Sequence, residues 1–160
     1  MLEITIAAVG KLKEKYWRDA AAEYAMRLGR YCRLSIAEAE DEQTPEGKRS
    51  VSPQVILARE GARLEKLIRP GTFLIVLAID GKRFSSEGFS EKLASLKVSG
   101  VSHITFVIGG SLGLSPEILR RADLKVSFSD MTFPHQMMRV ILLEQIYRAF
   151  RIERGEPYHK

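Results

Sequence analysis

The sequence predicts an α/β fold: a mostly parallel sheet with helices on both of its faces. Short apolar segments alternate with segments in which apolar residues recur every three or four positions, a pattern typical of alternating strands and helices. Residues 72–79 and 104–108 are apolar almost throughout, as parallel strands covered on both faces are. With 160 residues, 45% of them hydrophobic, the chain has the size and composition of one globular domain spanning residues 1–160.

The first half of the chain contains two predicted strands and two predicted helices. In order they are a strand at residues 2–9, a helix at 13–31, a strand at 33–39 and a helix at 55–69. Gly10 closes the first strand, and Pro70 with Gly71 ends the second helix. Residues 40–53 contain acidic residues and two prolines, which predicts a surface loop.

The second half repeats the alternation with shorter elements. Its predicted strands are residues 72–79, 104–108 and 124–128, and its helices begin near residues 86, 116 and 134, the last running to about residue 151. Asp80 and Gly81 are expected to turn the chain, Ser86 to cap the next helix, and Ser115 to cap the short one that follows. We expect His103 to cap an element or to lie on the surface.

Charge and residue usage narrow the class of protein. A net charge of +5 and an isoelectric point near 9.4 are compatible with a polyanionic partner without establishing one. Cys32 is the only cysteine, so neither an internal disulfide nor a cysteine-based zinc site can form, and we expect no metal. The longest apolar run, residues 73–79, is far shorter than the roughly 20 residues of a membrane helix. Because the N-terminus carries Glu3 and no long apolar core, we expect a cytoplasmic protein without a membrane partner.

Three loops lie where the predicted fold would bind a ligand. Ligands of open parallel sheets bind at the carboxyl ends of strands, which here are Ile79, Ile108 and Phe128. After Ile108, the adjacent Gly109 and Gly110 let the backbone approach a ligand, although they would equally suit a tight turn. Their spacing fits neither a P-loop nor a dinucleotide fingerprint, so a ligand other than a phosphate is expected there.

The loop from residue 128 to residue 135 is the second candidate. It is polar, yet it contains Met131 and Phe133, which indicates an apolar slot able to hold a ring such as adenine. The structural alternative is that Thr132 caps the following helix and His135 occupies its first turn.

The last predicted helix is apolar on nearly all sides, which predicts burial on several sides. In so short a chain a second copy hides this surface more easily than the chain's own fold, so we predict a homodimer built on this helix. The alternative is a central core helix in a monomer. Arg139 and Glu144 need partners and are expected to pair with each other, whereas Arg148 suits a phosphate or base contact.

The C-terminal tail, residues 153–160, is short and polar. Termini usually fray, but Pro157, Tyr158, His159 and Lys160 form a compact set for stacking on a base and touching a phosphate.

Four blocks of the chain, in the same order, carry a resemblance to a known family. They are residues 9–17 (VGKLKEKYW), 106–114 (FVIGGSLGL), 127–150 and 155–160 (GEPYHK). Together they resemble the ribosomal RNA large subunit methyltransferase H family, within the knotted SPOUT methyltransferases. The acidic loop at residues 40–53 contributes nothing to the match.

The resemblance implies an enzyme that uses S-adenosyl-L-methionine, acts as a homodimer and has a deep trefoil knot in its C-terminal half. The family methylates N3 of a pseudouridine in 23S rRNA on the assembled 70S ribosome. The positions that match the family's cofactor-binding residues are Leu77, Gly109, Phe128, Ser129, Asp130, Met131, Thr132 and Phe133.

The same resemblance, together with the chemistry of the acceptor, implies the residues around the target base. The N3–H of a uracil-type ring is weakly acidic, so a base or a cation that stabilises the resulting oxyanion should help to remove the proton. The residues expected there are His135, Arg148, Tyr158 and His159. Two alternatives remain open: a small α/β enzyme with another nucleotide-like cofactor, and a ribosome-binding module without catalysis.

Overall fold

The computed structural model describes residues 1–42 and 51–160 of the chain, and these form an α/β sandwich around a parallel sheet. Its strands are arranged in the order β2-β1-β4-β3-β5, and every neighbouring pair is parallel. The elements in chain order are β1 (Glu3–Val9), α1 (Lys15–Leu28), β2 (Arg33–Ala39), α2 (Pro53–Glu65), β3 (Phe73–Arg83), α3 (Ser86–Val98), β4 (His103–Ile108), α4 (Pro116–Arg121), β5 (Leu124–Ser127) and α5 (His135–Glu153). The predicted class and its parallel sheet are confirmed, and the trefoil knot stays a prediction.

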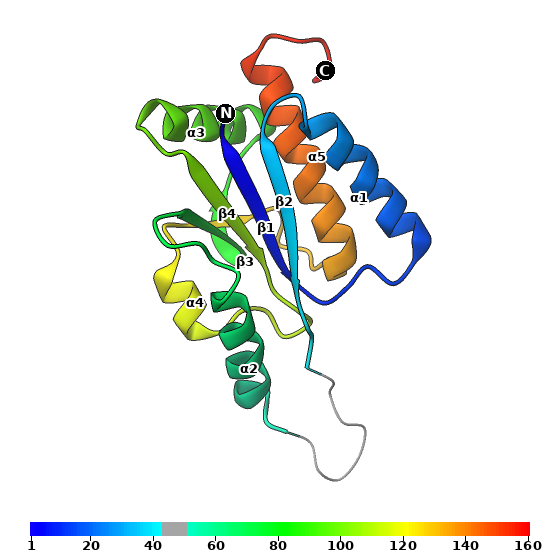
Figure 1. Cartoon of the computed structure of the whole chain (residues 1–160), viewed down its shortest axis with the longest axis vertical. Helices are drawn as coiled ribbons and strands as arrows, with labels where there is room; N and C mark the ends of the chain where they lie inside the picture. The colour runs from blue at the N-terminus through cyan, green and yellow to red at the C-terminus, as the bar shows by residue number, and fades with distance from the viewer. Residues whose placement is uncertain (43–50) are drawn as a thin grey trace.

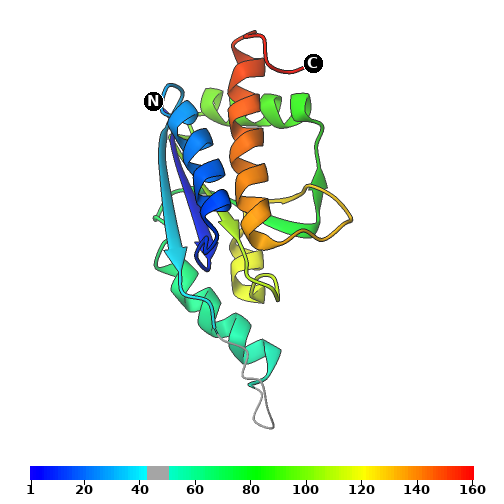
Figure 2. The same ribbon diagram turned by 90° about the vertical axis from the view of Figure 1, so that its right-hand side faces the viewer.

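Helices cover both faces of the sheet, as predicted. Helices α1, α3 and α5 pack on one face and α2 and α4 on the other (Figure 1). Alternate residues of β1 enter the two cores: Ile4 and Ile6 contact the first group of helices, Ala7 and Val9 the second. Figure 2 shows α5 beside α1, with α3 crossing near the end of α5.

Strand β3 differs most from its prediction. The expected turn at Asp80 and Gly81 is wrong, because the strand continues to Arg83. Its register on β5 jumps between Leu77 and Lys82, both of which lie opposite Val126, so the intervening residues bulge out of the ladder. A Cβ on Gly81 would lie 2.7 Å from the backbone of Val126, so only glycine permits this close approach.

The N-termini of α3 and α5 differ from those predicted, whereas that of α4 agrees. Ser85, not Ser86, caps α3, and its Oγ accepts the Gly88 N–H at 3.0 Å. Helix α5 begins at His135 after Pro134, without the side-chain cap expected from Thr132. The predicted cap at Ser115 is confirmed, since its Oγ accepts the Ile118 N–H at 3.3 Å.

His103 is buried at the start of β4, so the prediction that it caps an element or lies on the surface is wrong. Its ring nitrogen Nε2 lies 3.0 Å from the Thr5 hydroxyl. Most of the predicted surface loop at residues 40–53, namely residues 43–50, lies outside the described residues. Within the described ranges, the helices are too short or too polar to cross a membrane.

The charged residues of α5 have partners other than those predicted. Arg139 donates through Nη1 to Glu38 Oε2 at 2.6 Å and through Nη2 to the Gly10 carbonyl at 3.0 Å. Glu144 instead binds Arg148, whose Nη2 lies 2.6 Å from Glu144 Oε1. The predicted Arg139–Glu144 pair is wrong, because side chains five positions apart point to different sides of a helix while those four apart are neighbours.

Candidate active site

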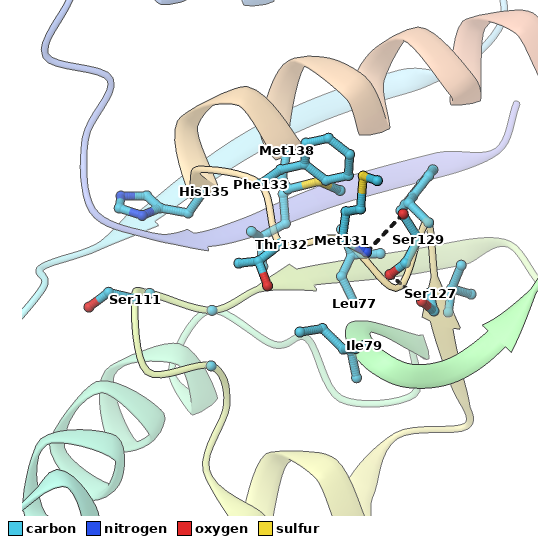
Figure 3. A pocket seen from close by; sticks show the side chains of 17 residues that line it. Leu77, Ile79, Ser111, Ser127, Ser129, Met131, Thr132, Phe133, His135 and Met138 are labelled. Carbon is cyan, nitrogen blue, oxygen red and sulfur yellow. Dashed lines mark hydrogen bonds between the residues drawn. The ribbon is translucent and has the colours of Figure 1, made fainter.

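A cavity of about 180 Å³ lies at the carboxyl ends of β3, β4 and β5. It is lined by Leu77, Ala78, Ile79, Ile108, Gly109, Gly110, Ser111, Gly113, Val126, Ser127, Phe128, Ser129, Met131, Thr132, Phe133, His135 and Met138. Figure 3 shows side chains from β3, from the loop after β4 and from the loop before α5 around the same space. This is the edge of the sheet where the sequence predicts a ligand.

The wall formed by the loop after β4 is a glycine turn. The Gly113 N–H donates to the Gly110 carbonyl at 3.0 Å, and Gly113 has φ +86°. A Cβ on Gly109 would lie 2.3 Å from the Gly113 carbonyl oxygen, so the turn closes only with glycine at that position. The cavity is therefore bordered here by backbone groups that no side chain shields.

The opposite wall, the loop between β5 and α5, is held by its serines. The Ser127 hydroxyl donates to the Ser129 carbonyl at 3.1 Å, and the Met131 N–H donates to the Ser129 hydroxyl at 2.9 Å (Figure 3). Asp130 does not line the cavity: it is mostly exposed and forms an ion pair with Arg83.

The bulge of β3 supplies the third wall. Ala78 and Ile79 lie in the stretch that leaves the ladder with β5, and both line the cavity. Because the bulge requires close approach at Gly81, the same irregularity that lengthens β3 shapes the site.

Most residues expected at the cofactor line the cavity. Seven of them do so, with Asp130 as the exception: Leu77, Gly109, Phe128, Ser129, Met131, Thr132 and Phe133. Other lining residues were not predicted individually, although Gly110, Ser111 and Gly113 belong to the glycine segment singled out in the sequence. Met138 could have been found from its helical spacing, since it follows His135 by three positions.

The residues expected around the target base fall into two groups. His135 lines the cavity, with its ring beside the loop after β1, where a Cβ on Gly10 would lie 3.5 Å from its Nε2. Arg148, Tyr158 and His159 form a separate cluster at the other end of α5, which we call the tail cluster. At a rise of 1.5 Å per residue, Arg148 lies about 20 Å along the helix from His135.

The tail cluster is organised by two carboxylates. Tyr158 donates its hydroxyl to Glu144 Oε1 at 3.1 Å, beside the ion pair of Glu144 with Arg148. The Arg148 guanidinium lies 4.7 Å from the centre of the Tyr158 ring, and its Nη1 lies 3.1 Å from His159 Nδ1. His159 Nε2 lies 2.7 Å from Glu87 Oε1 on α3. The tail is therefore docked on its own chain through defined contacts.

These contacts shift the proton affinities of the tail cluster. Burial raises the pKa of Tyr158 to about 12, and the hydrogen bond to the Glu144 carboxylate adds to the effect. The hydrogen bond from Arg148 to Glu144 raises the pKa of the guanidinium. At neutral pH Tyr158 is thus an uncharged hydrogen-bond donor and Arg148 a permanent cation.

The fold and the position of the cavity agree with a family assignment. Residues 2–159 match the family described as "Predicted SPOUT methyltransferase", so the chain belongs to the SPOUT methyltransferases. A solved structure, described as a probable methylase family protein from Haemophilus influenzae, aligns with a TM-score of 0.53 at 16% identity. It covers 100% of this chain and 72% of its own, and it supports the fold alone.

Curated relatives match the chain over its full length. The ribosomal RNA large subunit methyltransferase H of Bifidobacterium adolescentis is 58% identical over 159 residues, which covers 99% of this chain and 100% of the relative. Proteins of the same name from Clostridium kluyveri and Acetivibrio thermocellus are 54% and 53% identical, with the same coverage. The predicted relationship to that family is confirmed.

Proposed function

We propose that this protein transfers a methyl group from S-adenosyl-L-methionine to N3 of a pseudouridine in the 23S rRNA of the assembled 70S ribosome, in the cytoplasm. Membership of the SPOUT methyltransferases supports methyl transfer, and the names of its full-length relatives support ribosomal RNA as the acceptor. The observation that carries the proposal is the cavity, which brings together seven residues at positions matching the family's cofactor contacts.

The residues of the cavity fit the nucleoside part of this cofactor. Leu77, Ile108 and Met138 provide apolar walls for a flat ring, and the glycine turn provides backbone donors and acceptors close to it. When bound, the cofactor supplies a methyl group activated by its positive sulfur. The cavity is smaller than the roughly 300–1,000 Å³ typical of pockets that enclose a whole ligand, so one protomer leaves part of the ligand open.

A second copy of the chain would complete this site. Arg148 lies about 20 Å from His135 along α5, and Tyr158 and His159 contact Arg148 or its partner Glu144, so the two groups do not meet within one protomer unless the tail moves. Exposed apolar side chains border the cavity: the lining residues Ile79 and Met131 are 59% and 73% accessible, and Leu112, between the lining residues Ser111 and Gly113, is 44% accessible. Such a rim is typical of a surface that another protein covers. A homodimer that places the tail of one protomer over the cavity of the other accounts for both features.

The tail cluster carries the groups that the acceptor chemistry needs. Loss of the N3 proton places negative charge on the adjacent carbonyl oxygens of the base. The Arg148 guanidinium keeps N–H groups beyond those bonded to Glu144 and can stabilise this charge. The neutral Tyr158 hydroxyl can do the same once it exchanges its bond to Glu144 for one to the base. Imidazole is a common general base, so His135 from the cavity is a candidate base. His159 from the tail is a second candidate only once it leaves Arg148 and Glu87, which occupy both of its ring nitrogens.

Transfer of labelled methyl groups tests the proposed reaction. We expect incorporation into 70S ribosomes that lack the modification but not into protein-free 23S rRNA, with the label recovered as N3-methylpseudouridine after digestion. Calorimetry should show binding of S-adenosyl-L-methionine and not of adenine nucleotides. Absence of label from every ribosomal substrate would refute the reaction and favour a non-catalytic ribosome-binding module.

Removal of Tyr158, His159 and Lys160 tests the division of the site. We expect the shortened chain to lose methylation while it still binds the cofactor, because these residues lie outside the cavity. An equal loss of both activities would contradict this division. Light scattering should show a dimer at micromolar concentration, and a monomer would refute the composite site.

Mixed dimers test whether the tail acts across the interface. At a limiting cofactor concentration, we expect Gly109→Ala, a cavity variant, to lose most of its activity and the tail-deleted chain to lose all of it. A mixed dimer of the two has one site built from an intact cavity and an intact tail, so unfolding and refolding them together should restore activity. Activity that stays absent in verified mixed dimers would show that the tail acts within its own protomer.

A further inference from the structure

A buried carboxylate lies directly behind the glycine turn of the cavity. Glu60, on α2, is only 5% exposed and belongs neither to the lining of the cavity nor to the tail cluster. Charged side chains are almost never buried to this extent unless a partner compensates the charge. Packing alone does not explain why a carboxylate lies at this position.

Close contacts hold Glu60 against the turn. Its Oε2 accepts the Glu42 N–H at 3.0 Å, and a Cβ on Gly110 would lie 3.2 Å from its Oε1. The next residue, Gly61, packs so tightly against Ser115 that an added Cβ would lie 2.5 Å from the Ser115 hydroxyl oxygen. Helix α2 is thereby fixed in place, and only the backbone of Gly110 separates the Glu60 carboxylate from the cavity.

Among the described residues, the two cations that flank Glu60 on α2 pair with Glu42 and not with Glu60. Arg59 and Arg63 both bind Glu42, with nitrogen–oxygen distances of 2.7 Å, and their side chains are 51% and 36% exposed. Charges that reach into water are screened, whereas a buried charge acts through the protein with a lower effective dielectric constant. The buried Glu60 carboxylate, behind Gly110, therefore adds a negative potential to the cavity that solvent screens little.

We infer that Glu60 is a specificity-determining residue whose carboxylate makes the cavity prefer a positively charged ligand over its neutral counterpart. The inference rests on the proposed function, in which the methyl donor carries a positive sulfur and the product does not. In the transfer, the bond from sulfur to the methyl carbon breaks and its electron pair returns to sulfur, while the lone pair of deprotonated N3 forms the new bond. The product S-adenosyl-L-homocysteine is neutral at sulfur, so Glu60 favours retention of the substrate and release of the product.

The size of the effect follows from Coulomb's law. Opposite unit charges about 12 Å apart, at an effective dielectric constant of about 20, change an affinity about tenfold. Because the cavity is small, a ligand inside it lies within such a distance of Gly110 and of the carboxylate behind it. The preference of the wild type for a cationic ligand should therefore fall about tenfold when the charge is removed.

Calorimetry on Glu60→Gln with three ligands tests the inference. The probes are S-adenosyl-L-methionine, sinefungin, which carries an ammonium group near the position of the sulfur, and neutral S-adenosyl-L-homocysteine. Glutamine keeps the oxygen that accepts the Glu42 N–H, so we expect a folded protein. Both cationic ligands should lose about tenfold in affinity relative to the neutral one. Glu117→Gln, which removes the same charge from an exposed side chain on α4, should leave the ratio unchanged.

The remaining outcomes are distinguishable. If the glutamine variant does not fold, Glu60→Met removes the charge without leaving a polar group in the core and is measured in its place. An equal change for all three ligands, or a failure of both variants to fold, overturns the inference and assigns Glu60 a purely structural role. If the wild type binds none of the three, the proposed cofactor itself is wrong.

Discussion

Replacement of Glu38 by alanine should destabilise the protein, because it leaves the buried guanidinium of Arg139 without its carboxylate partner. Arg139 is 2% exposed and donates to Glu38 at 2.6 Å and to the Gly10 carbonyl at 3.0 Å. Among the described residues its Nε has no hydrogen-bond partner, so little else compensates the charge. The ion pair ties the start of α5 to the ends of β1 and β2, which makes it a structural link as well as an electrostatic one.

The magnitude follows from the burial of the two partners. Removing one partner of a buried ion pair costs about 3–5 kcal/mol. The Glu38 side chain is 35% exposed, so water reaches the vacated position and we expect a loss of about 2–3 kcal/mol in the free energy of unfolding. For a chain of this size that loss lowers the melting temperature by about 5–10 °C. Adding Arg139→Met should recover at least half of the lost free energy of unfolding, since the double variant has no buried charge without a partner.

Urea unfolding followed by circular dichroism, at one fixed protein concentration, measures these free energies. Glu3→Ala is the matched control, because it removes a carboxylate whose partners Arg33 and Arg69 are exposed, and should cost less than about 1 kcal/mol. A Glu38→Ala variant that unfolds within about 0.5 kcal/mol of the wild type would show that Arg139 does not depend on this partner. A double variant no more stable than Glu38→Ala alone would show that the loss does not come from an uncompensated charge.

Two further predictions concern the glycine turn and a buried histidine. Gly109→Ala should weaken binding of S-adenosyl-L-methionine at least about tenfold by calorimetry, because its Cβ would lie 2.3 Å from the Gly113 carbonyl oxygen. Gly29→Ala, on a helix end with negative φ, should leave that affinity unchanged, and equal binding by both variants would show that the turn does not form the site. Burial lowers the pKa of His103 below its ordinary 6.5, so at pH values just below 6.5 the unfolded chain binds more protons than the folded one. The free energy of unfolding should therefore fall as the pH drops below about 6.5. His103→Gln, which can still bond to Thr5, should reduce that fall in urea titrations between pH 7.5 and 5. A fall as large as in the wild type would contradict the role of His103.

Features set by neighbouring residues could be predicted from the sequence. The serine cap of α4 and the apolar run of β4 depend on residues within a few positions, so local pattern suffices. The cavity could be located because strand ends of a parallel sheet share one edge, which needs only the order of elements. For the same reason the sequence predicts that the glycine segment beginning at Gly109 belongs to the site.

Features set by distant partners could not be predicted. The extension of β3 depends on the close approach of Gly81 to Val126. From its neighbours alone, a glycine after an aspartate predicts a turn, so the sequence does not indicate the longer strand. Arg139 finds Glu38, 101 positions away, and no spacing rule points to that partner. The direction of Asp130, in the loop after β5, depends on its ion pair with Arg83 at the end of β3, which explains why one residue expected at the cofactor is outside the cavity lining.

In the proposed dimer, the length of α5 sets the distance between the cavity and the tail cluster. His135 at its first turn and Arg148 near its last are held at a separation that the helix alone sets, about 20 Å. Insertion or deletion of one helical turn between them would change that separation by about 5.4 Å while leaving every residue of both groups intact. Apart from Arg139 and Glu144, which are constrained by their ion pairs, the residues between them should tolerate apolar exchanges that preserve packing but not a change in their number.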